Sequence, residues 1–165
     1  MAEYYELMLA CYLKEDVPKH VVDVLRYLLS IDNSSFEPEP ETPDVLPDHF
    51  FFSMEGWNLV LAGRDPFPGE GIAKLAFADS INAYEFTVRV TVRKGLYLIT
   101  SFVHWLTPYI STDGFIGYTT GEFSYLVWLI FTKDEKLFYN RLEADKHPPQ
   151  VTQIEIMDSD TINYL

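Results

Sequence analysis

Two segments of the chain alternate between apolar and polar side chains in the way that strands do. Residues 84–93 place four apolar side chains, from Phe86 to Val92, on one face and polar side chains on the other. This pattern predicts a strand with one buried face. Residues 5–14 also begin with Tyr-Glu and end with a basic residue, but they are apolar on both faces. That is typical of a more central strand, or of one that is covered on both faces.

Each of these segments is followed by a pattern with the period of a helix. Residues 21–28 and 99–106 correspond at an offset of 78, one less than the offset of the two strands. In the first helix the apolar residues recur on one side, which indicates a face that packs on a core. Asp16 is placed to cap this helix, and Pro18 fits its first turn, where a backbone N–H is not needed.

The remaining strand patterns are short and are separated by Gly, Pro and Asp turn signals. They cover residues 57–62, 71–78, 125–131, 137–141 and 151–156. Residues 50–52 and 115–117 also correspond between the two halves, after the helices. The first half carries an extra loop at 36–48, which is rich in proline and acidic residues. Such a segment forms neither a helix nor a central strand, so we expect an exposed connector.

The order of these elements predicts an α+β fold. A strand, a helix and several strands are followed by the same series again, so we expect two helices on a mainly antiparallel sheet. The sequence indicates an internal duplication of this strand-helix-strands unit, as a ferredoxin-like variant. The chain of 165 residues is expected to form one domain built of two similar halves, about 1–82 and 83–165.

Several short segments resemble a group of small bacterial proteins of unknown function. They lie at 5–7, 13–18, 25–28, 105–109 and 113–118, and read YEL, LKEDVP, LRYL, WLTPY and DGFIGY. The resemblance implies a bacterial cytoplasmic protein. It carries over no catalytic residue, and therefore no mechanism.

Composition and charge narrow the classes of partner. The chain is 48% hydrophobic, with 12 basic and 25 acidic side chains and a net charge of -13. This charge repels phosphate, so we expect no nucleic-acid partner and no anionic membrane surface. The longest apolar run, residues 126–131, is far below the ~20 residues that span a bilayer. The start of the chain lacks a signal-peptide pattern, which favours the cytoplasm. The single cysteine, Cys11, is expected to be buried and inert.

No motif assigns a chemistry to the chain, and we expect neither a cofactor nor a metal. His20, Asp16 and Asp23 are spaced to meet a metal on one helix, but a cap, a surface histidine and an ion pair explain them separately. Asp48 and His49 are neighbours, and a carboxylate beside an imidazole supports acid–base chemistry. Neighbouring residues on a strand point to opposite faces, which weakens that interpretation.

The second helix is unusual because residues 95–111 contain no Asp, Glu, Lys or Arg. Its outer side is polar but uncharged, and interface cores are depleted in charge. We consider three explanations: cover by the protein's own loops, including 36–48, then a homodimer contact, then a ligand pocket. The candidate interface residues are Tyr97, Thr100, Ser101, His104 and Thr107.

Aromatic residues are concentrated on the predicted strands, where most should belong to the core. A sheet face lined with aromatic rings can also bind a flat or apolar ligand beside a few polar groups. The candidate pocket residues are Arg89, Tyr118, Trp128, His49 and Asp113.

These patterns favour a non-catalytic binding protein, which we expect to be a homodimer. The first half holds 5 basic and 15 acidic residues, against 7 and 10 in the second. An acidic inhibitor or immunity-type partner of a basic protein fits this asymmetry, although acidity also serves solubility alone. The alternative is a small-molecule binder or small enzyme that uses the aromatic sheet face, with His104, His49 or Asp113 as acid–base groups.

Overall fold

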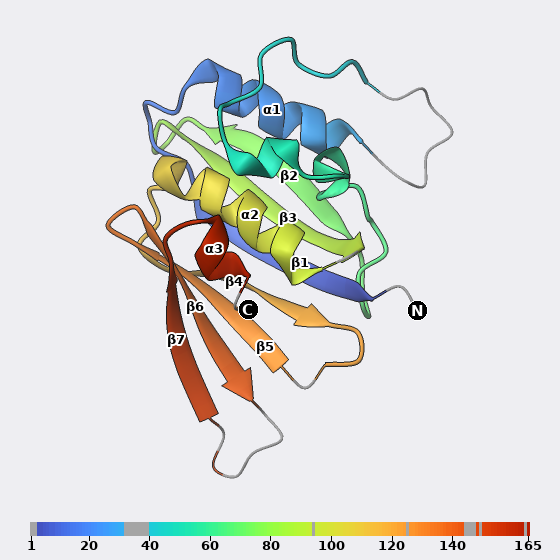
Figure 1. Cartoon of the computed structure of the whole chain (residues 1–165). Helices are drawn as coiled ribbons and strands as arrows, with labels where there is room; N and C mark the ends of the chain where they lie inside the picture. The colour runs from blue at the N-terminus through green and yellow to red at the C-terminus, as the bar shows by residue number, and fades with distance from the viewer. Residues whose placement is uncertain are drawn as a thin grey trace.

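The computed structural model describes residues 3–31, 40–93, 95–124, 126–143, 148, 150–163 and 165. Its main feature is one antiparallel sheet of seven strands in the order β2-β3-β1-β4-β5-β6-β7 (Figure 1). The strands are β1 (Tyr4–Tyr12), β2 (Ile72–Ala78), β3 (Ala83–Arg93), β4 (Gly114–Gly121), β5 (Leu126–Lys133), β6 (Lys136–Glu143) and β7 (Gln150–Ile156).

Strand β1, the first of these strands in chain order, lies inside the sheet and pairs with β3 on one side and β4 on the other. Leu7 stands opposite Val90 of β3 and Thr119 of β4. The strands from β4 to β7 follow one another as a meander of antiparallel neighbours. Residues that were expected to be apolar on both faces therefore do form an inner strand.

Helices cover one face of this sheet (Figure 1). They are α1 (Lys19–Ser30), α2 (Leu96–Leu106) and the short α3 (Ser159–Ile162), together with the 3-10 helices η1 (Phe50–Ser53), η2 (Trp57–Leu59) and η3 (Thr107–Tyr109). The apolar stripe of α1, including Val21, Leu25 and Leu28, is fully buried. Side chains of β1 and β3 that point toward the helices, such as Leu9 and Val88, are also fully buried. The core therefore lies between the helices and this face.

The expected fold class is wrong. The structure is an open seven-stranded antiparallel sheet with three short helices, and not two helices on a sheet in a duplicated, ferredoxin-like arrangement. The two halves do not share one plan, because the described part of residues 1–82 supplies β1 and β2 whereas the second half supplies β3 to β7. The predicted correspondence between residues 50–52 and 115–117 is wrong, because residues 50–52 belong to the 3-10 helix η1 whereas residues 115–117 belong to strand β4.

Three local predictions also differ from the structure. Residues 57–62 form η2 and a turn rather than a strand, because Gly56 has a left-handed conformation, with φ 75°. The N-cap position of α1 is held by Pro18 rather than Asp16, and it makes no side-chain cap hydrogen bond. Of the acidic loop 36–48, residues 36–39 lie outside the described part, and the rest have no helix or strand.

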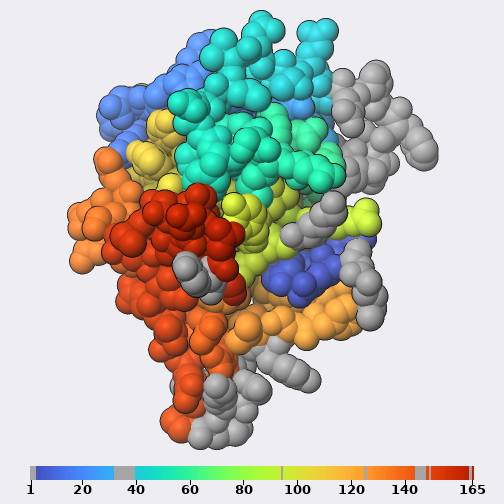
Figure 2. Space-filling view, viewed as in Figure 1, coloured from blue at the N-terminus to red at the C-terminus, as the bar shows by residue number. Residues whose placement is uncertain are grey.

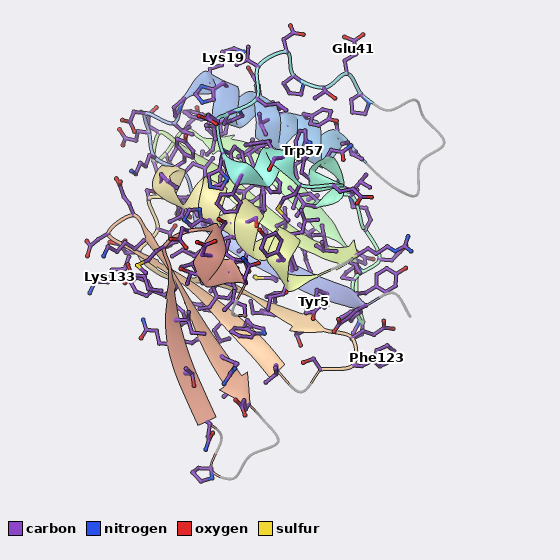
Figure 3. The ribbon with its side chains drawn as sticks, in the orientation of Figure 1. Tyr5, Lys19, Glu41, Trp57, Phe123 and Lys133 are labelled. Atoms are coloured by element: carbon purple, nitrogen blue, oxygen red, sulfur yellow. The ribbon has the colours of Figure 1, made fainter. Side chains whose placement is uncertain are left out.

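Aromatic rings join the 3-10 segments to the helices. Phe51 is fully buried and lies 5.6 Å from Phe102 and 6.0 Å from Trp105, measured between ring centroids. Trp57 lies beside α1, 5.8 Å from the ring of Tyr27 (Figure 3). Through these contacts η1 and η2 are packed onto α1 and α2. No helix in the described ranges is both long and apolar enough to cross a membrane.

Candidate functional site

The sheet face opposite the helices is not covered by any described helix. Its outer part carries apolar side chains that stand next to one another across strands: Phe115 faces Phe131, which faces Phe138. Cross-strand partners lie on one face of a sheet. Phe115 is 52% exposed, and Val151 on the edge strand β7 is 60% exposed. We call this surface the β4–β7 patch, and its members are Phe115, Val127, Leu129, Phe131, Phe138, Leu142 and Val151.

The inner part of the same face is polar and contains a buried carboxylate. Glu6 of β1 is only 3% exposed. The guanidinium of Arg89 donates to it from β3, with Nε 3.3 Å from Oε1 and Nη2 3.4 Å from Oε2. The hydroxyl of Tyr118 donates to Oε1 from β4. Two of the predicted pocket residues, Arg89 and Tyr118, therefore do meet, on either side of a glutamate.

Two groups in this cluster have raised pKa values. The hydrogen bond to Glu6 raises the pKa of Arg89. Burial raises the pKa of Tyr118, and its hydrogen bond to the Glu6 carboxylate adds to this effect. Both shifts keep the guanidinium of Arg89 charged and the phenol of Tyr118 neutral at pH 7. Because both oxygens of Glu6 are occupied, the arrangement is that of an anchor rather than of a free general base.

The cluster holds a loop against the sheet. Arg89 also donates to the backbone carbonyls of Phe67 and Pro68, at 2.9 and 2.8 Å. Two residues further along β3, Thr91 donates from Oγ1 to the backbone carbonyl of Asp65 at 2.7 Å. The segment before β2 therefore lies over β3 and covers the polar part of the face. The β4–β7 patch remains outside this cover.

The predicted interface on α2 is mostly buried within the chain. Thr100 and Ser101 are fully buried and Thr107 is 2% exposed. Among the described elements, η1 and α3 pack against α2. In Figure 2 residues near 50 and the C-terminal segment lie next to α2 and leave only parts of it visible. Only Tyr97, at 38% exposed, is an exposed residue of the five candidates.

The fifth candidate, His104, contacts another predicted residue, His49. Nε2 of His49 lies 3.0 Å from Nδ1 of His104. Nδ1 of His49 accepts the backbone N–H of Phe51 at 3.1 Å and so caps η1. Burial and the neighbouring His104 together lower the pKa of His49 to about 4, against the opposing effect of Asp48. Burial also lowers the pKa of His104. Both rings are therefore neutral at pH 7.

The remaining candidates do not join either cluster. Trp128 is 3% exposed and points to the helix side, where its ring lies 6.3 Å from that of Tyr139. Asp113 is exposed in the connection before β4. On α1, Asp23 forms an ion pair with Lys19 at 2.5 Å. This ion pair explains the position of Asp23 next to His20 without a metal ion. No group of three or more potential metal ligands occurs among the described residues.

The larger of two described cavities lies where the beginnings of β1 and α2 meet η2, with a volume of about 1150 Å³. Its charges are mixed, because Arg93 and Arg64 line it together with Glu55, Asp65 and Glu122. Arg64 donates to the carbonyls of Leu29 and Ile31, at 2.8 and 3.2 Å. The charges that line the cavity therefore favour neither an anionic nor a cationic ligand.

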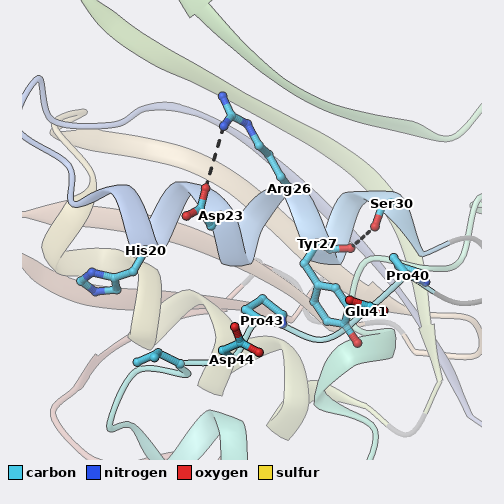
Figure 4. Close-up of a pocket in the computed structure, with 10 residues that line it drawn as sticks. His20, Asp23, Arg26, Tyr27, Ser30, Pro40, Glu41, Pro43 and Asp44 are labelled. Atoms are coloured by element: carbon cyan, nitrogen blue, oxygen red, sulfur yellow. Dashed lines mark hydrogen bonds and ion pairs between the residues drawn. The ribbon is translucent and has the colours of Figure 1, made fainter.

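The smaller cavity, about 520 Å³, lies between α1 and residues 40–45 (Figure 4). Tyr27 closes one side through a hydrogen bond to Thr42 at 3.2 Å. Acidic Asp23, Glu41 and Asp44 line it. The negative charge of Asp23 is partly compensated by the guanidinium of Arg26, whose Nη1 lies 4.0 Å from Oδ1 of Asp23.

Sequence reasoning missed Glu6 and the pairing of the two histidines. A lone acidic residue within an apolar strand is a signal for Glu6, since buried carboxylates require partners. The identity of those partners depends on strand order, which the sequence does not contain. The residues of the histidine pair are 55 positions apart, and no periodicity links them.

Comparisons with known proteins do not add to these observations. No family model, no curated protein and no solved structure matches the chain. The site must therefore be interpreted from its own geometry.

Proposed function

We propose that this protein is a non-catalytic binding protein that forms a homodimer through the β4–β7 patch. The observation that carries the proposal is the row of neighbouring phenylalanines, Phe115, Phe131 and Phe138, on a face that none of the described helices covers. Contiguous exposed apolar patches of this kind mark interaction surfaces in soluble proteins. The proposed location is the cytoplasm, where the single cysteine, Cys11, stays reduced.

Charge supports a second copy as the occupant. Residues 114–156 hold 6 acidic and 4 basic side chains, a net charge of -2, whereas the whole chain carries -13. Two copies that meet at this patch keep their acidic first halves apart. Contact at the acidic first half would instead add repulsion between like charges.

The dimensions of the patch limit how much of a dimer contact it supplies. β4, β5 and β6 have eight residues each and β7 has seven. At ~4.8 Å between strands and ~3.4 Å per residue, this part of the sheet covers about 500 Å² in projection. A standard interface buries about 800 Å² of accessible surface per partner. The projected area is smaller than this value, so a dimer contact through the patch must also include the polar residues around it.

Sedimentation velocity of the purified chain tests the proposal. We expect a particle of twice the chain mass of 19.1 kDa. Phe115→Lys and Phe131→Lys should each give monomers, because an unpaired charge is then buried in the contact. Ile72→Lys is the matched control, since Ile72 is 46% exposed on β2, outside the patch, and should leave the dimer intact. A monomeric wild-type chain, or dimers that survive both patch substitutions, would refute the proposal.

A second candidate, an acidic partner of a basic protein, is supported by the smaller cavity. Asp23, Glu41 and Asp44 line this cavity on the acidic half of the chain. Binding of a lysine-rich peptide, measured by fluorescence anisotropy, should weaken in the double variant Glu41→Gln/Asp44→Asn and weaken with added salt. Equal binding by Glu122→Gln and the double variant would instead indicate non-specific attraction.

A further inference from the structure

A row of three residues crosses the strand ends that line the larger cavity. Tyr4 of β1 stands opposite Arg93 of β3. On the other side of β1, the backbone N–H of Glu122 donates to the carbonyl of Tyr4 at 2.9 Å. This bond continues the pairing of β1 with β4. Directly opposite residues lie on the same face of a sheet. A base and an acid therefore flank an aromatic ring in the lining of this cavity.

The two charges of this row are not paired with each other. Within the described part of the chain, the side chains of Arg93 and Glu122 make no ion pair and no hydrogen bond. The same face of the sheet also contains the opposite case, in which Glu6 binds both Arg89 and Tyr118. One charged cluster is thus satisfied within the protein, whereas the charges of the row remain for water or for a ligand.

The spacing of the strands sets the size of a ligand that bridges these charges. Arg93 and Glu122 are separated by β1, which places their Cα atoms about 10 Å apart, at two strand spacings of ~4.8 Å. Because strand side chains stand roughly perpendicular to the sheet, their charged ends keep about this separation. A contact of about 3 Å at each end leaves about 4 Å between the two charges of the ligand. The ammonium and carboxylate of an α-amino acid are roughly 3 Å apart.

The rest of the lining provides apolar surface and further acids. Tyr4, Leu59 and Tyr97 line the cavity and are 37%, 40% and 38% exposed. The cavity of about 1150 Å³ has room for a ligand with a ring, since ligand pockets typically measure about 300–1,000 Å³. Glu55 and Asp65 also lie in the lining, and their charges disfavour a ligand whose only charge is a carboxylate.

We propose that this cavity binds a small zwitterion with an aromatic side chain, of the α-amino-acid type, whose carboxylate contacts Arg93 and whose ammonium contacts Glu122. The other arginine of the lining, Arg64, donates to the carbonyls of Leu29 and Ile31 and is therefore engaged within the protein. Arg93 is thus the group that receives the carboxylate. The lining contains no member of the β4–β7 patch, so this site is independent of the proposed dimer contact.

Nitrogen-15 NMR titration of the full chain at pH 7 tests the proposal with three aromatic probes. L-phenylalanine carries both charges, 3-phenylpropanoate lacks the ammonium, and 2-phenylethylamine lacks the carboxylate. We expect saturable shifts in the amides around Leu59 and Tyr97, and about fivefold tighter binding of L-phenylalanine than of either other probe. Arg93→Gln should weaken L-phenylalanine about fivefold and leave 2-phenylethylamine unchanged. Glu122→Gln should weaken L-phenylalanine to a similar extent and leave 3-phenylpropanoate unchanged.

Lys74→Gln and Glu15→Gln are the matched controls, because they remove one charge of each sign from exposed positions outside the cavity and should keep the wild-type affinities. Equal affinities for the three probes, or an unchanged affinity for L-phenylalanine in Arg93→Gln, would overturn the proposal. The absence of saturable shifts around the cavity would overturn it as well. A monomeric chain that binds L-phenylalanine as expected would contradict the dimer contact and support this site.

Discussion

Truncation of Phe51 should weaken the attachment of η1 to the rest of the protein. The ring is fully buried and has ring contacts with Phe52, Trp57, Phe102 and Trp105 at centroid distances of 5.0 to 6.0 Å. Phe51→Ala removes the transfer free energy of the ring and leaves a cavity, and such changes cost about 3–5 kcal/mol. Because four aromatic neighbours lose a partner, we expect a loss of about 4 kcal/mol in the free energy of unfolding.

Urea unfolding followed by tryptophan fluorescence measures this loss. The melting temperature should fall by about 8–16 °C, from about 2–4 °C per kcal/mol for a chain of this size. Phe51→Leu keeps most of the volume and should cost less than Phe51→Ala, which provides a measurable variant if the alanine form does not fold. Phe123→Ala is the control, because Phe123 is 74% exposed, and it should change stability by less than about 0.5 kcal/mol. Equal effects of Phe51→Ala and Phe123→Ala would refute the reasoning.

Three further predictions concern burial and close packing. Burial raises the pKa of Cys11 to about 12, so a thiol reagent at pH 8 should label the native chain far more slowly than the urea-unfolded chain; equal rates would contradict this. Gly117→Ala should prevent or strongly weaken pairing of β1 with β4, because a Cβ atom would lie 1.9 Å from the carbonyl oxygen of Met8; a melting temperature equal to wild type would contradict it. The pKa of His49 is lowered to about 4 from 6.5, so its contribution to stability is complete above pH 6.5 and is lost as the pH falls toward 4; urea midpoints between pH 7 and 4 should decrease less in His49→Gln.

The sequence predicts local elements well where one periodicity dominates. The alternation of residues 84–93 and the apolar stripe of residues 21–28 correspond to β3 and α1. Residues 50–52 have no alternation, and their three phenylalanines fit a helix turn as well as a strand. In the structure the side chain of His49 caps η1, and the ring of Phe51 packs between α2 and η2. Tertiary contacts therefore determined this element.

The architecture depended on pairings between distant residues, which periodicity does not encode. The prediction of a duplicated fold assumed that similar patterns occupy similar places. In the structure β1 pairs with both β3 and β4, whereas β2 is an edge strand with one partner. The same limit applies to the site. Arg89 and Tyr118 were candidates from their residue types, but their common partner Glu6 follows only from the order of the strands.

The position of β1 inside the sheet has a consequence for synthesis on the ribosome. β1 ends at Tyr12, but its two partners end at Arg93 and Gly121. At ~5–20 residues per second, the partners are complete only on the order of 5–20 s after β1 has been made. During this interval the emerging chain holds an apolar strand without a neighbour, next to α1. An inner strand that is made first thus lengthens the time in which the nascent chain depends on chaperones or on cover by its own first helix.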